Sequence, residues 1–439
     1  MLNYTESIEL LFSKLPMFNR VGAAAIKKNI DNTLALCERL GNPHHQFKTI
    51  HIAGTNGKGS ASHTLAAILQ TAGYKTGLYT SPHLFDFRER MRVNGEKINK
   101  DFVSAFTTKT APWFDEIEPS FFEITVAMAF DYFANQKVDI AVIEVGLGGR
   151  TDSTNIISPE LSVITNIGWD HMNLLGNTLP EIAWEKAGII KSNIPVVIGE
   201  TQKEIVNVFE EEAKMVNTSL FFADNFHKIK NYDFIENHLQ VEIESYNNPT
   251  TKVYNLELTG LYQQKNLITV LEAVNQLQSK GWDITDEHVS IAVNQVRKIT
   301  RFHGRWELLQ SNPRVIVDVG HNEDGFKQIL QQLAVTRFKQ LHLIIGMVKD
   351  KDVDRVMALL PENAQFYFTR ADIPRAMPET DLAEIASKYQ HFGKCFANVN
   401  IALNEALNNA NPDDLILICG SVFLAGEVKL LQDKMKDNQ

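Results

Sequence analysis

The sequence predicts an α/β protein in which a large, mostly parallel sheet is followed by a smaller, doubly wound sheet. From Phe47 onward, short apolar runs that indicate strands alternate with runs of helical periodicity, which is typical of a parallel sheet covered on both faces. The alternation is interrupted near residue 228 and starts again after residue 305. Polar residues gather where strands end, as they do around ligand sites in such sheets. We therefore expect two domains, residues 1–299 and residues 300–439.

The segment before the first strand is expected to be helical. Apolar residues lie on one side of a helix over residues 5–15, and the pattern repeats over residues 23–40 until Gly41, Asn42 and Pro43 end it. The strands of the first sheet are expected at residues 47–53, 75–80, 138–145, 160–165, 194–198 and 219–223. The helices between them are clearest at residues 58–72, 121–136 and 202–216.

The interruption over residues 228–258 carries alternating apolar and polar residues on both sides of the turn Asn247-Asn248-Pro249. This pattern predicts a small antiparallel hairpin, followed by helices at residues 262–279 and 284–298. The strands of the second domain are expected at residues 314–319, 341–347, 364–369 and 414–420. Its helices are expected near residues 323–336, 379–389, 398–410 and 422–435.

The overall composition excludes several classes of partner. A net charge of −10 over 439 residues argues against affinity for nucleic acid or anionic membranes, because both need a cationic surface. Cys37, Cys395 and Cys419 are not spaced as a metal knuckle, which suits a reducing compartment. The first residues, MLNYTESIEL, do not have the design of a signal peptide, and the apolar stretch at residues 415–426 is too short to span a bilayer. We expect a cytoplasmic protein that acts on small molecules.

The most informative segment is IHIAGTNGKGS at residues 50–60, where a β-branched run leads through a glycine-rich turn into a helical pattern. Glycines let backbone N–H groups crowd a phosphate, the lysine neutralises its charge, and the hydroxyl can reach a magnesium ion. The alternative is a glycine-rich connection that binds nothing, but a lysine and a serine at a strand-to-helix junction favour an ATP site. The expected ATP-binding residues of this loop are Gly54, Thr55, Asn56, Gly57, Lys58, Gly59 and Ser60.

Glu144 closes an apolar strand just before the run Gly146-Leu147-Gly148-Gly149-Arg150. A buried carboxylate needs a partner, and a magnesium ion shared with ATP phosphates would supply one. The alternative is a salt bridge to Arg150. The glycine run lacks the spacing of a dinucleotide fingerprint, so it is only a weak sign of an oxidoreductase. His171 follows another strand end, where it is either a second metal ligand or a surface residue.

A loop rich in charge follows Ser81, with Arg88, Glu89, Arg90 and Arg92. Such a run is either a solvated loop or a lid whose cations contact a polyanionic substrate.

Lys186 lies in a short helix among apolar residues. There it is either a buried lysine of lowered pKa or an ion-paired surface residue. At the domain boundary, Arg305 could reach back to phosphates as an arginine finger. Asp318 to Asn322 and Ser421 place polar groups at two more strand ends, and Ser421 could cap the helix that follows it.

These motifs together resemble those of the folylpolyglutamate synthases and dihydrofolate synthases of the Mur ligase superfamily, over nearly the whole chain. The matching segments are IHIAGTNGKGS at 50–60, TSPHL at 80–84, ERMRVNG at 89–95, FFEITVAMAF at 121–130, EVGLGGRTDSTN at 144–155, WEKAGIIK at 184–191, HGRWE at 303–307, DVGHN at 318–322 and GSVFLAGEV at 420–428.

The resemblance implies a Mur-ligase-like fold with an ATP-binding N-terminal domain and a C-terminal glutamate-ligase domain. It implies an ATP-dependent ligase, expected to be a monomer, that joins L-glutamate to dihydropteroate, to folates or to both through an acyl phosphate. We expect both acceptors. The competing hypotheses are a cell-wall Mur ligase that acts on a UDP-sugar peptide and a nucleotide-driven switch that ligates nothing.

The resemblance also assigns roles to residues. Ser81, Glu144 and His171 match magnesium ligands, with two ions expected, and Lys186 matches a lysine that is carbamylated. The positions that match further ATP contacts are Asn266, Arg305 and Asp318. The residues expected to contact the acceptor or glutamate are Arg88, Phe122, Glu123, Asp152, Thr154, Asn155, His321 and Ser421. The residues expected to take part in catalysis are Lys58, His171, Lys186 and Arg305.

Overall fold

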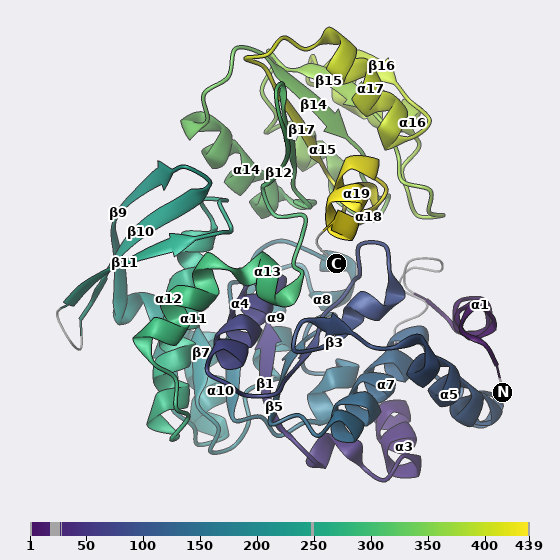
Figure 1. The fold of residues 1–439 in the computed structure, drawn as a ribbon, viewed down its shortest axis with the longest axis vertical. Helices are drawn as coiled ribbons and strands as arrows, with labels where there is room; N and C mark the ends of the chain where they lie inside the picture. Colours follow the sequence, from purple (N-terminus) through teal and green to yellow (C-terminus); the bar gives the residue numbers. More distant parts are fainter. Residues whose placement is uncertain (1, 18–26, 28, 247–249, 438–439) are drawn as a thin grey trace.

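The computed structural model describes residues 2–17, 27, 29–246 and 250–437. It contains three sheets (Figure 1). The largest has eight strands in the order β4-β3-β2-β5-β1-β6-β7-β8. The bounds of these strands are β1 Lys48–Ala53, β2 Thr76–Tyr79, β3 Met91–Val93, β4 Glu96–Lys97, β5 Ile140–Glu144, β6 Leu161–Ile164, β7 Val196–Ile198 and β8 Leu220–Phe222. All neighbours from β2 to β8 run parallel, whereas β3 and β4 are antiparallel at one edge.

Helices cover both faces of this sheet. One face carries α4, α11, α12 and α13, whose apolar residues share a core with β1, β5 and β6. The other carries α3, α5 and α7 at one end and α9 and α10 at the other. The bounds of the helices are α1 Tyr4–Lys14, α3 Asp31–Arg39, α4 Lys58–Thr71, α5 Lys100–Thr110, α6 Phe114–Ile117, α7 Phe121–Gln136, α8 Met172–Leu175, α9 Leu179–Ala187, α10 Val206–Met215, α11 Gln263–Ser279, α12 Asp286–Asn294 and α13 Val296–Thr300.

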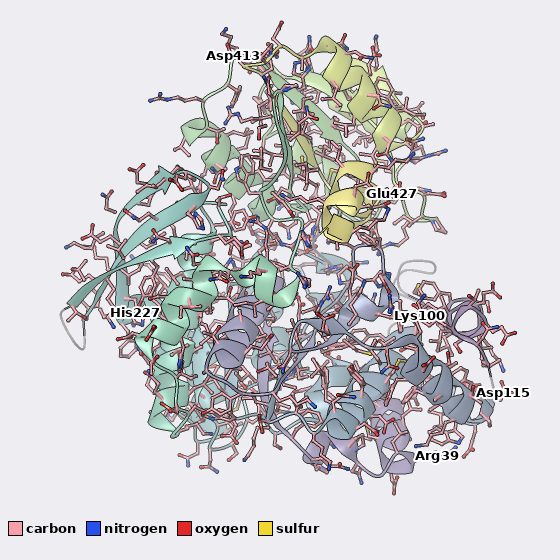
Figure 2. The ribbon with its side chains drawn as sticks, in the orientation of Figure 1. Arg39, Lys100, Asp115, His227, Asp413 and Glu427 are labelled. Atoms are coloured by element: carbon pink, nitrogen blue, oxygen red, sulfur yellow. The ribbon has the colours of Figure 1, made fainter. Side chains whose placement is uncertain are left out.

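The N-terminal helices are held by surface contacts to the same domain. The ammonium group of Lys100, which begins α5, lies over the ring of Tyr4 in α1 (Figure 2). Lys14 pairs with Asp115 at 2.9 Å, and Arg39 of α3 pairs with a glutamate in α6. The helix predicted at residues 23–40 is observed only as α3, because residues 23–26 and 28 lie outside the described residues.

The second sheet is antiparallel and has three strands, β9 His227–Ile235, β10 His238–Ser245 and β11 Thr250–Leu256. The predicted hairpin is therefore incomplete, because the sequence pattern singled out two strands and missed β9, most of whose residues are exposed. The turn at residues 247–249 lies outside the described residues. His227, the first residue of β9 and labelled in Figure 2, pairs with Glu272 of α11 at 3.2 Å and ties the sheet to the large domain.

The third sheet has six strands in the order β12-β13-β17-β14-β15-β16 and is parallel except for β12. Its strands are β12 Glu307–Ser311, β13 Arg314–Val317, β14 Leu341–Ile345, β15 Gln365–Phe368, β16 Gly393–Cys395 and β17 Leu415–Cys419. Its helices are α14 Glu323–Val335, α15 Val353–Met357, α16 Glu379–Ser387, α17 Val399–Asn409, α18 Val422–Gly426 and α19 Lys429–Asp437. Two apolar cores, one on each face, confirm the doubly wound arrangement.

The fold class and the predicted strands are confirmed, and two helix predictions need correction. The helix expected at 284–298 is interrupted at Gln295 and forms α12 and α13. The helix expected at 422–435 ends at Gly426 and restarts at Lys429. The three cysteines of the chain are free. Among the described residues, no helix has both the length and the apolar character needed to cross a membrane.

Candidate functional site

A cavity of about 460 Å³ lies where the carboxyl ends of β1, β2 and β5 face loops of the C-terminal sheet. Most of the predicted site residues line it, although they are distributed over nearly the whole chain. Those residues are Gly54, Thr55, Asn56, Gly57, Lys58, Gly59, Ser60, Ser81, Phe122, Glu123, Glu144, Asp152, His171, Lys186, Arg305, Asp318, His321 and Ser421. Four predicted residues are not among those that line it, namely Arg88, Thr154, Asn155 and Asn266.

The glycine-rich loop connects β1 to α4, which begins at Lys58. Gly57 has a φ of +84°, and a Cβ atom there would come within 2.4 Å of the side-chain oxygen of Asn266, so only glycine fits. Asn266 therefore packs behind the loop. The ammonium of Lys58 folds back over the loop and donates to the carbonyls of Gly54 at 2.9 Å and Thr55 at 3.2 Å. Burial lowers the pKa of Lys58.

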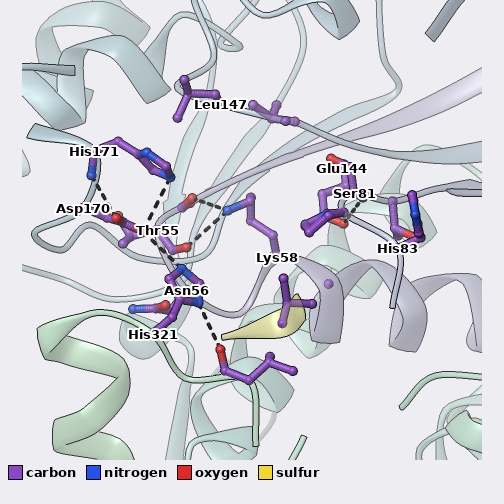
Figure 3. Close-up of a pocket in the computed structure, with 18 of the residues that line it drawn as sticks. Thr55, Asn56, Lys58, Ser81, His83, Glu144, Leu147, Asp170, His171 and His321 are labelled. Atoms are coloured by element: carbon purple, nitrogen blue, oxygen red, sulfur yellow. Dashed lines mark hydrogen bonds and ion pairs between the residues drawn. The ribbon is translucent and has the colours of Figure 1, made fainter. Parts of the chain in front are cut away.

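Glu144 and Ser81 lie together at one end of the view in Figure 3, where the Ser81 N–H donates to Glu144 at 3.3 Å. Burial raises the pKa of Glu144 to about 7, although the charges of Lys58 and Arg305 oppose the shift. The alternative salt bridge to Arg150 is not formed, because Arg150 pairs with Glu212 at 3.0 Å. Glu144 is thus a buried carboxylate that accepts a hydrogen bond from a backbone amide.

Asp170 and His171 lie on the other side of Lys58 (Figure 3). His171 lines the cavity with 22% of its side chain exposed, and burial lowers its pKa to about 3. Lys351, from the loop after β14, pairs with Asp170 and approaches His171 Nε2 at 3.3 Å. Burial alone would raise the pKa of Asp170, but the charges of Lys351 and His171 hold it well below its usual range. Sequence reasoning missed Lys351. It lies in the charged segment Lys-Asp-Lys-Asp at residues 349–352, which is typical of an exposed loop.

Lys186 is 4% exposed, which excludes the surface interpretation. Burial, together with the charge of Lys58, lowers the pKa of Lys186 to about 7. At that value, about half of the amine is neutral near neutral pH. A neutral amine is a nucleophile, whereas an ammonium group is not.

The charged loop after Ser81 is largely buried, so the solvated-loop interpretation is wrong for its core residues. Arg90 is 5% exposed, lines the cavity, donates from Nε to His83 Nδ1 at 2.8 Å and lies over the ring of Phe121. Arg88 instead points to Asp86, with which it pairs at 2.7 Å. Both arginines lie in the short 3₁₀ helix Phe87–Arg90, before β3 begins at Met91, and charge alone did not predict which arginine faces the cavity.

The residues expected to contact the acceptor are held in place by hydrogen bonds to the backbone. Glu123 caps its own helix, because its carboxylate accepts from the Ser120 N–H at 2.6 Å. Asp152 lines the cavity and accepts from the Leu147 N–H at 2.8 Å. Asn155 lies beneath the cavity wall, where its amide donates to two backbone carbonyls at 3.0 Å.

The C-terminal sheet contributes the opposite wall. Asp318 accepts from the Tyr262 hydroxyl at 2.6 Å and from the Trp306 N–H at 2.8 Å, which anchors the segment that carries Arg305. His321 Nε2 lies 3.5 Å from Asp170. Ser421 caps α18 by accepting from the Phe423 N–H at 3.1 Å, as the sequence predicted.

Comparison with known proteins gives two family-model matches. The Mur ligase middle domain matches residues 52–274, and the Mur ligase glutamate ligase domain matches residues 304–422. A dihydrofolate synthase/folylpolyglutamate synthase of Bacillus subtilis is 33% identical over 418 residues, covering 92% of this chain and 95% of that protein. A probable bifunctional folylpolyglutamate synthase/dihydropteroate synthase of Haloferax volcanii is 32% identical over 98% of this chain, which spans only 50% of that longer relative.

Solved structures agree over the full length. Escherichia coli FolC in complex with DHPP and ADP matches with a TM-score of 0.84 and 27% identity, covering 99% of both chains. A folylpolyglutamate synthase of Mycobacterium tuberculosis complexed with ADP matches with a TM-score of 0.85 and 28% identity, covering 96% of both chains. Together with the family models and the cavity, these matches establish that this chain belongs to the folylpolyglutamate synthase and dihydrofolate synthase family of Mur ligases.

Proposed function

We propose that this chain is an ATP-dependent ligase of folate metabolism that adds L-glutamate to both dihydropteroate and folates. The observation that carries the proposal is a single cavity that joins a phosphate-binding loop, a buried strand-end carboxylate and a wall from the C-terminal sheet. The relatives and solved structures that match the full chain carry these activities or ligands in their names.

The chemistry needs an activated carboxylate, because an amine does not displace a carboxylate oxygen. ATP transfers its γ-phosphoryl group to the acceptor carboxylate, and the resulting acyl phosphate loses phosphate when the amine of glutamate attacks its carbonyl carbon. Lys58 and Arg305 would spread the negative charge that develops on the phosphoryl oxygens, an effect worth about 3 kcal/mol for one well-placed donor. Closure of the cavity between the two sheets would exclude water from the acyl phosphate.

Magnesium fits the residues on the ATP side of the cavity. Glu144 and Ser81 offer oxygen ligands, and the raised pKa of Glu144 marks a carboxylate that a cation would stabilise. Among the described residues, no three histidine, cysteine or acidic side chains form a complete metal site, so phosphate oxygens would supply the other ligands. When bound, such ions would neutralise the charge of the triphosphate. We propose two ions, with His171 and a carbamate on Lys186 near the second.

The decisive experiment measures ADP formation by the purified chain with ATP, magnesium, each pteroyl acceptor and labelled glutamate. We expect ADP only when acceptor and glutamate are both present, and products whose masses increase by one glutamyl residue per turnover. Full ADP formation without an acceptor would support a nucleotide switch. Ligation to a UDP-sugar peptide alone would support a cell-wall Mur ligase.

A matched pair of variants tests the phosphate loop. Lys58→Ala should lower kcat by at least about 100-fold with both acceptors, whereas Lys203→Ala, which removes an exposed lysine, should not change it. Equal rates in the two variants would contradict the assignment of the loop.

The proposal also covers the domain boundary, the oligomeric state and the location of the protein in the cell. We place the boundary between the ATP-binding part, residues 1–299, and the glutamate-ligase part, residues 300–439, in the segment before β12. We also propose that the chain acts as a monomer in the cytoplasm. Light scattering during size-exclusion chromatography tests whether the chain is a monomer, and fractionation of the native cells tests whether it is cytoplasmic.

A further inference from the structure

A buried chain of hydrogen bonds runs from strand β1 to the wall of the cavity. His51 is fully buried, and its Nε2 lies 2.9 Å from the hydroxyl of Thr154. That hydroxyl donates to Asp152, which also accepts from the Thr154 N–H at 3.0 Å and from the Leu147 N–H at 2.8 Å. Asp152 lines the cavity, whereas His51 and Thr154 lie behind it. The chain therefore connects a residue remote from substrate to the inner surface of the site.

The direction of each hydrogen bond follows from counting protons. Burial raises the pKa of Asp152, and the hydrogen bonds from Thr154 and from the Leu147 N–H oppose that shift. In its ionised form Asp152 can only accept, so the single hydroxyl proton of Thr154 points to it. The Thr154 oxygen can then only accept from His51, which must carry its proton on Nε2. His51 Nδ1 is a buried atom without a hydrogen-bond partner in the described part of the chain, which fits a bare lone pair. Burial, with the charge of Lys191, lowers the pKa of His51 to about 3, so the ring is neutral.

The chain of hydrogen bonds ends at the Gly146–Leu147 peptide, which packs against the ring of Phe122. Asp152 holds the peptide before Leu147, and the adjacent Gly146 packs directly against Phe122. A Cβ atom on Gly146 would come within 2.3 Å of that ring. Any shift of this peptide therefore moves Phe122, which lines the cavity.

We propose that His51 is a positioning residue for the pteroyl acceptor, because its Nε2–H orients Thr154 so that Asp152 holds the Gly146–Leu147 peptide and Phe122 in place. The inference rests on the proposed function, since it takes the pteroyl acceptor as the substrate whose binding depends on these hydrogen bonds. Histidine and threonine act here through Asp152 and do not touch the reacting atoms.

The test uses two pairs of variants and compares the KM of each substrate. His51→Leu and Thr154→Val remove a link, whereas His51→Gln and Thr154→Ser keep a donor or a hydroxyl near the same place. We expect the first pair to raise the KM for dihydropteroate about tenfold, the cost of a hydrogen bond to a charged network. The second pair should stay within about threefold of the parent chain, and the KM for ATP should not change in any of the four.

The KM for ATP separates positioning from general damage, because β1 runs directly from His51 into the phosphate loop at Gly54. A disturbed strand would raise the KM for ATP together with that for dihydropteroate, and this outcome would overturn the proposal. So would equal defects in His51→Leu and His51→Gln. His391→Leu is the control for loss of a buried histidine, because His391 Nε2 bonds the carbonyl of Met357 in α15 at 2.9 Å, among the helices of the C-terminal part.

A second measurement needs no turnover, so it distinguishes failure of this inference from failure of the proposed function. The ring-nitrogen chemical shifts of isotope-labelled histidine, assigned to His51 by comparison with His51→Gln, report its tautomer. We expect the proton on Nε2 in the parent chain and in the Thr154→Ser variant. A proton on Nδ1 would overturn the chain of hydrogen bonds even if ligase activity is found. If the proton is on Nε2 but the protein ligates nothing, the hydrogen-bond chain is supported and the proposed function is wrong.

Discussion

The side-chain amides of Asn56 and Asn322 exchange two hydrogen bonds, each with a nitrogen-to-oxygen distance of 3.2 Å. Asn56 belongs to the phosphate loop, and Asn322 is the N-cap of α14 beside the C-terminal sheet. The pair therefore joins the two walls of the cavity at the point where the triphosphate is expected. Asn322 also donates to Asp170 at 3.1 Å, so a second residue of the large domain shares this contact.

We expect the Asn56–Asn322 contact to stabilise the closed arrangement by about 1 kcal/mol, the net value of a typical hydrogen bond. A double-mutant cycle with Asn56→Ala and Asn322→Ala, followed by urea unfolding, measures this interaction free energy. Asn322 also caps α14, because its side chain accepts from the Gly325 N–H at 2.8 Å. The cycle subtracts the free energy lost with this cap, because the cap is lost in both variants that lack Asn322. Strictly additive effects of the two substitutions would contradict the coupling.

Glu307 should make the stability of the chain depend on acidic pH. It is fully buried between His303 Nδ1 at 3.0 Å and Lys434 at 3.3 Å. Burial alone would raise its pKa, but the hydrogen bond from His303 and the surrounding positive charges lower it to about 2. Because the folded pKa lies below the unfolded one, the stabilisation is complete above about pH 4.5 and is lost as the pH falls toward 2.

The free energy of unfolding of the parent chain should therefore fall across that pH window by an amount on the order of 3 kcal/mol from this group. Glu307→Gln should reduce the slope of stability against pH, and Glu287→Gln, at an exposed position in α12, should leave it unchanged. Urea unfolding between pH 2 and about pH 5 provides the measurement. Identical slopes in the parent chain and Glu307→Gln would refute the assignment.

Lys351 is expected to bind a carboxylate of the incoming glutamate. Lys351 lines the cavity on the wall from the C-terminal sheet, as do His321 and Ser421, and its ammonium pairs with Asp170. Lys351→Met should raise the KM for glutamate about tenfold or more, as expected for the loss of a charge-assisted hydrogen bond, and should affect the KM for the pteroyl acceptor less. Lys349→Met, in the same loop but exposed, is the control. A larger effect on the acceptor than on glutamate would count against this role.

The fold and the core of the site were predictable from sequence because both depend on local patterns. Lys58 and Glu144 close or follow apolar strands, and parallel strands bring their carboxyl ends to one edge. The short edge strand β16, with the sequence Gly-Lys-Cys, was missed because it contains no apolar alternation and all three of its residues are exposed.

The residues in and behind the cavity that sequence reasoning missed depend on tertiary contacts. Lys351 reaches Asp170 across a separation of 181 residues, and no local signal distinguishes it from the exposed lysine two positions before it. Arg90 lines the cavity, whereas Arg88 of the same 3₁₀ helix pairs with Asp86, and charge and spacing do not reveal this difference. His51 lies within an apolar strand and gave no sequence signal of its own, because its partner Thr154 lies 103 residues away.

The lowered pKa of Lys186 predicts how a carbamate on this residue would depend on pH. The ammonium group first loses one proton, the neutral amine then attacks the carbon of CO₂, and a second proton leaves for solvent, so the side-chain charge changes overall from positive to negative. Because burial lowers the pKa of Lys186 to about 7, the reactive neutral fraction rises steeply between about pH 6 and pH 8, well below the range of an ordinary lysine. Native mass spectrometry in bicarbonate buffer should detect one CO₂ adduct that increases over this range and is absent in Lys186→Met. An adduct of equal abundance in that variant would place the reaction on another amine, and no adduct at pH 8 would show that Lys186 stays unmodified.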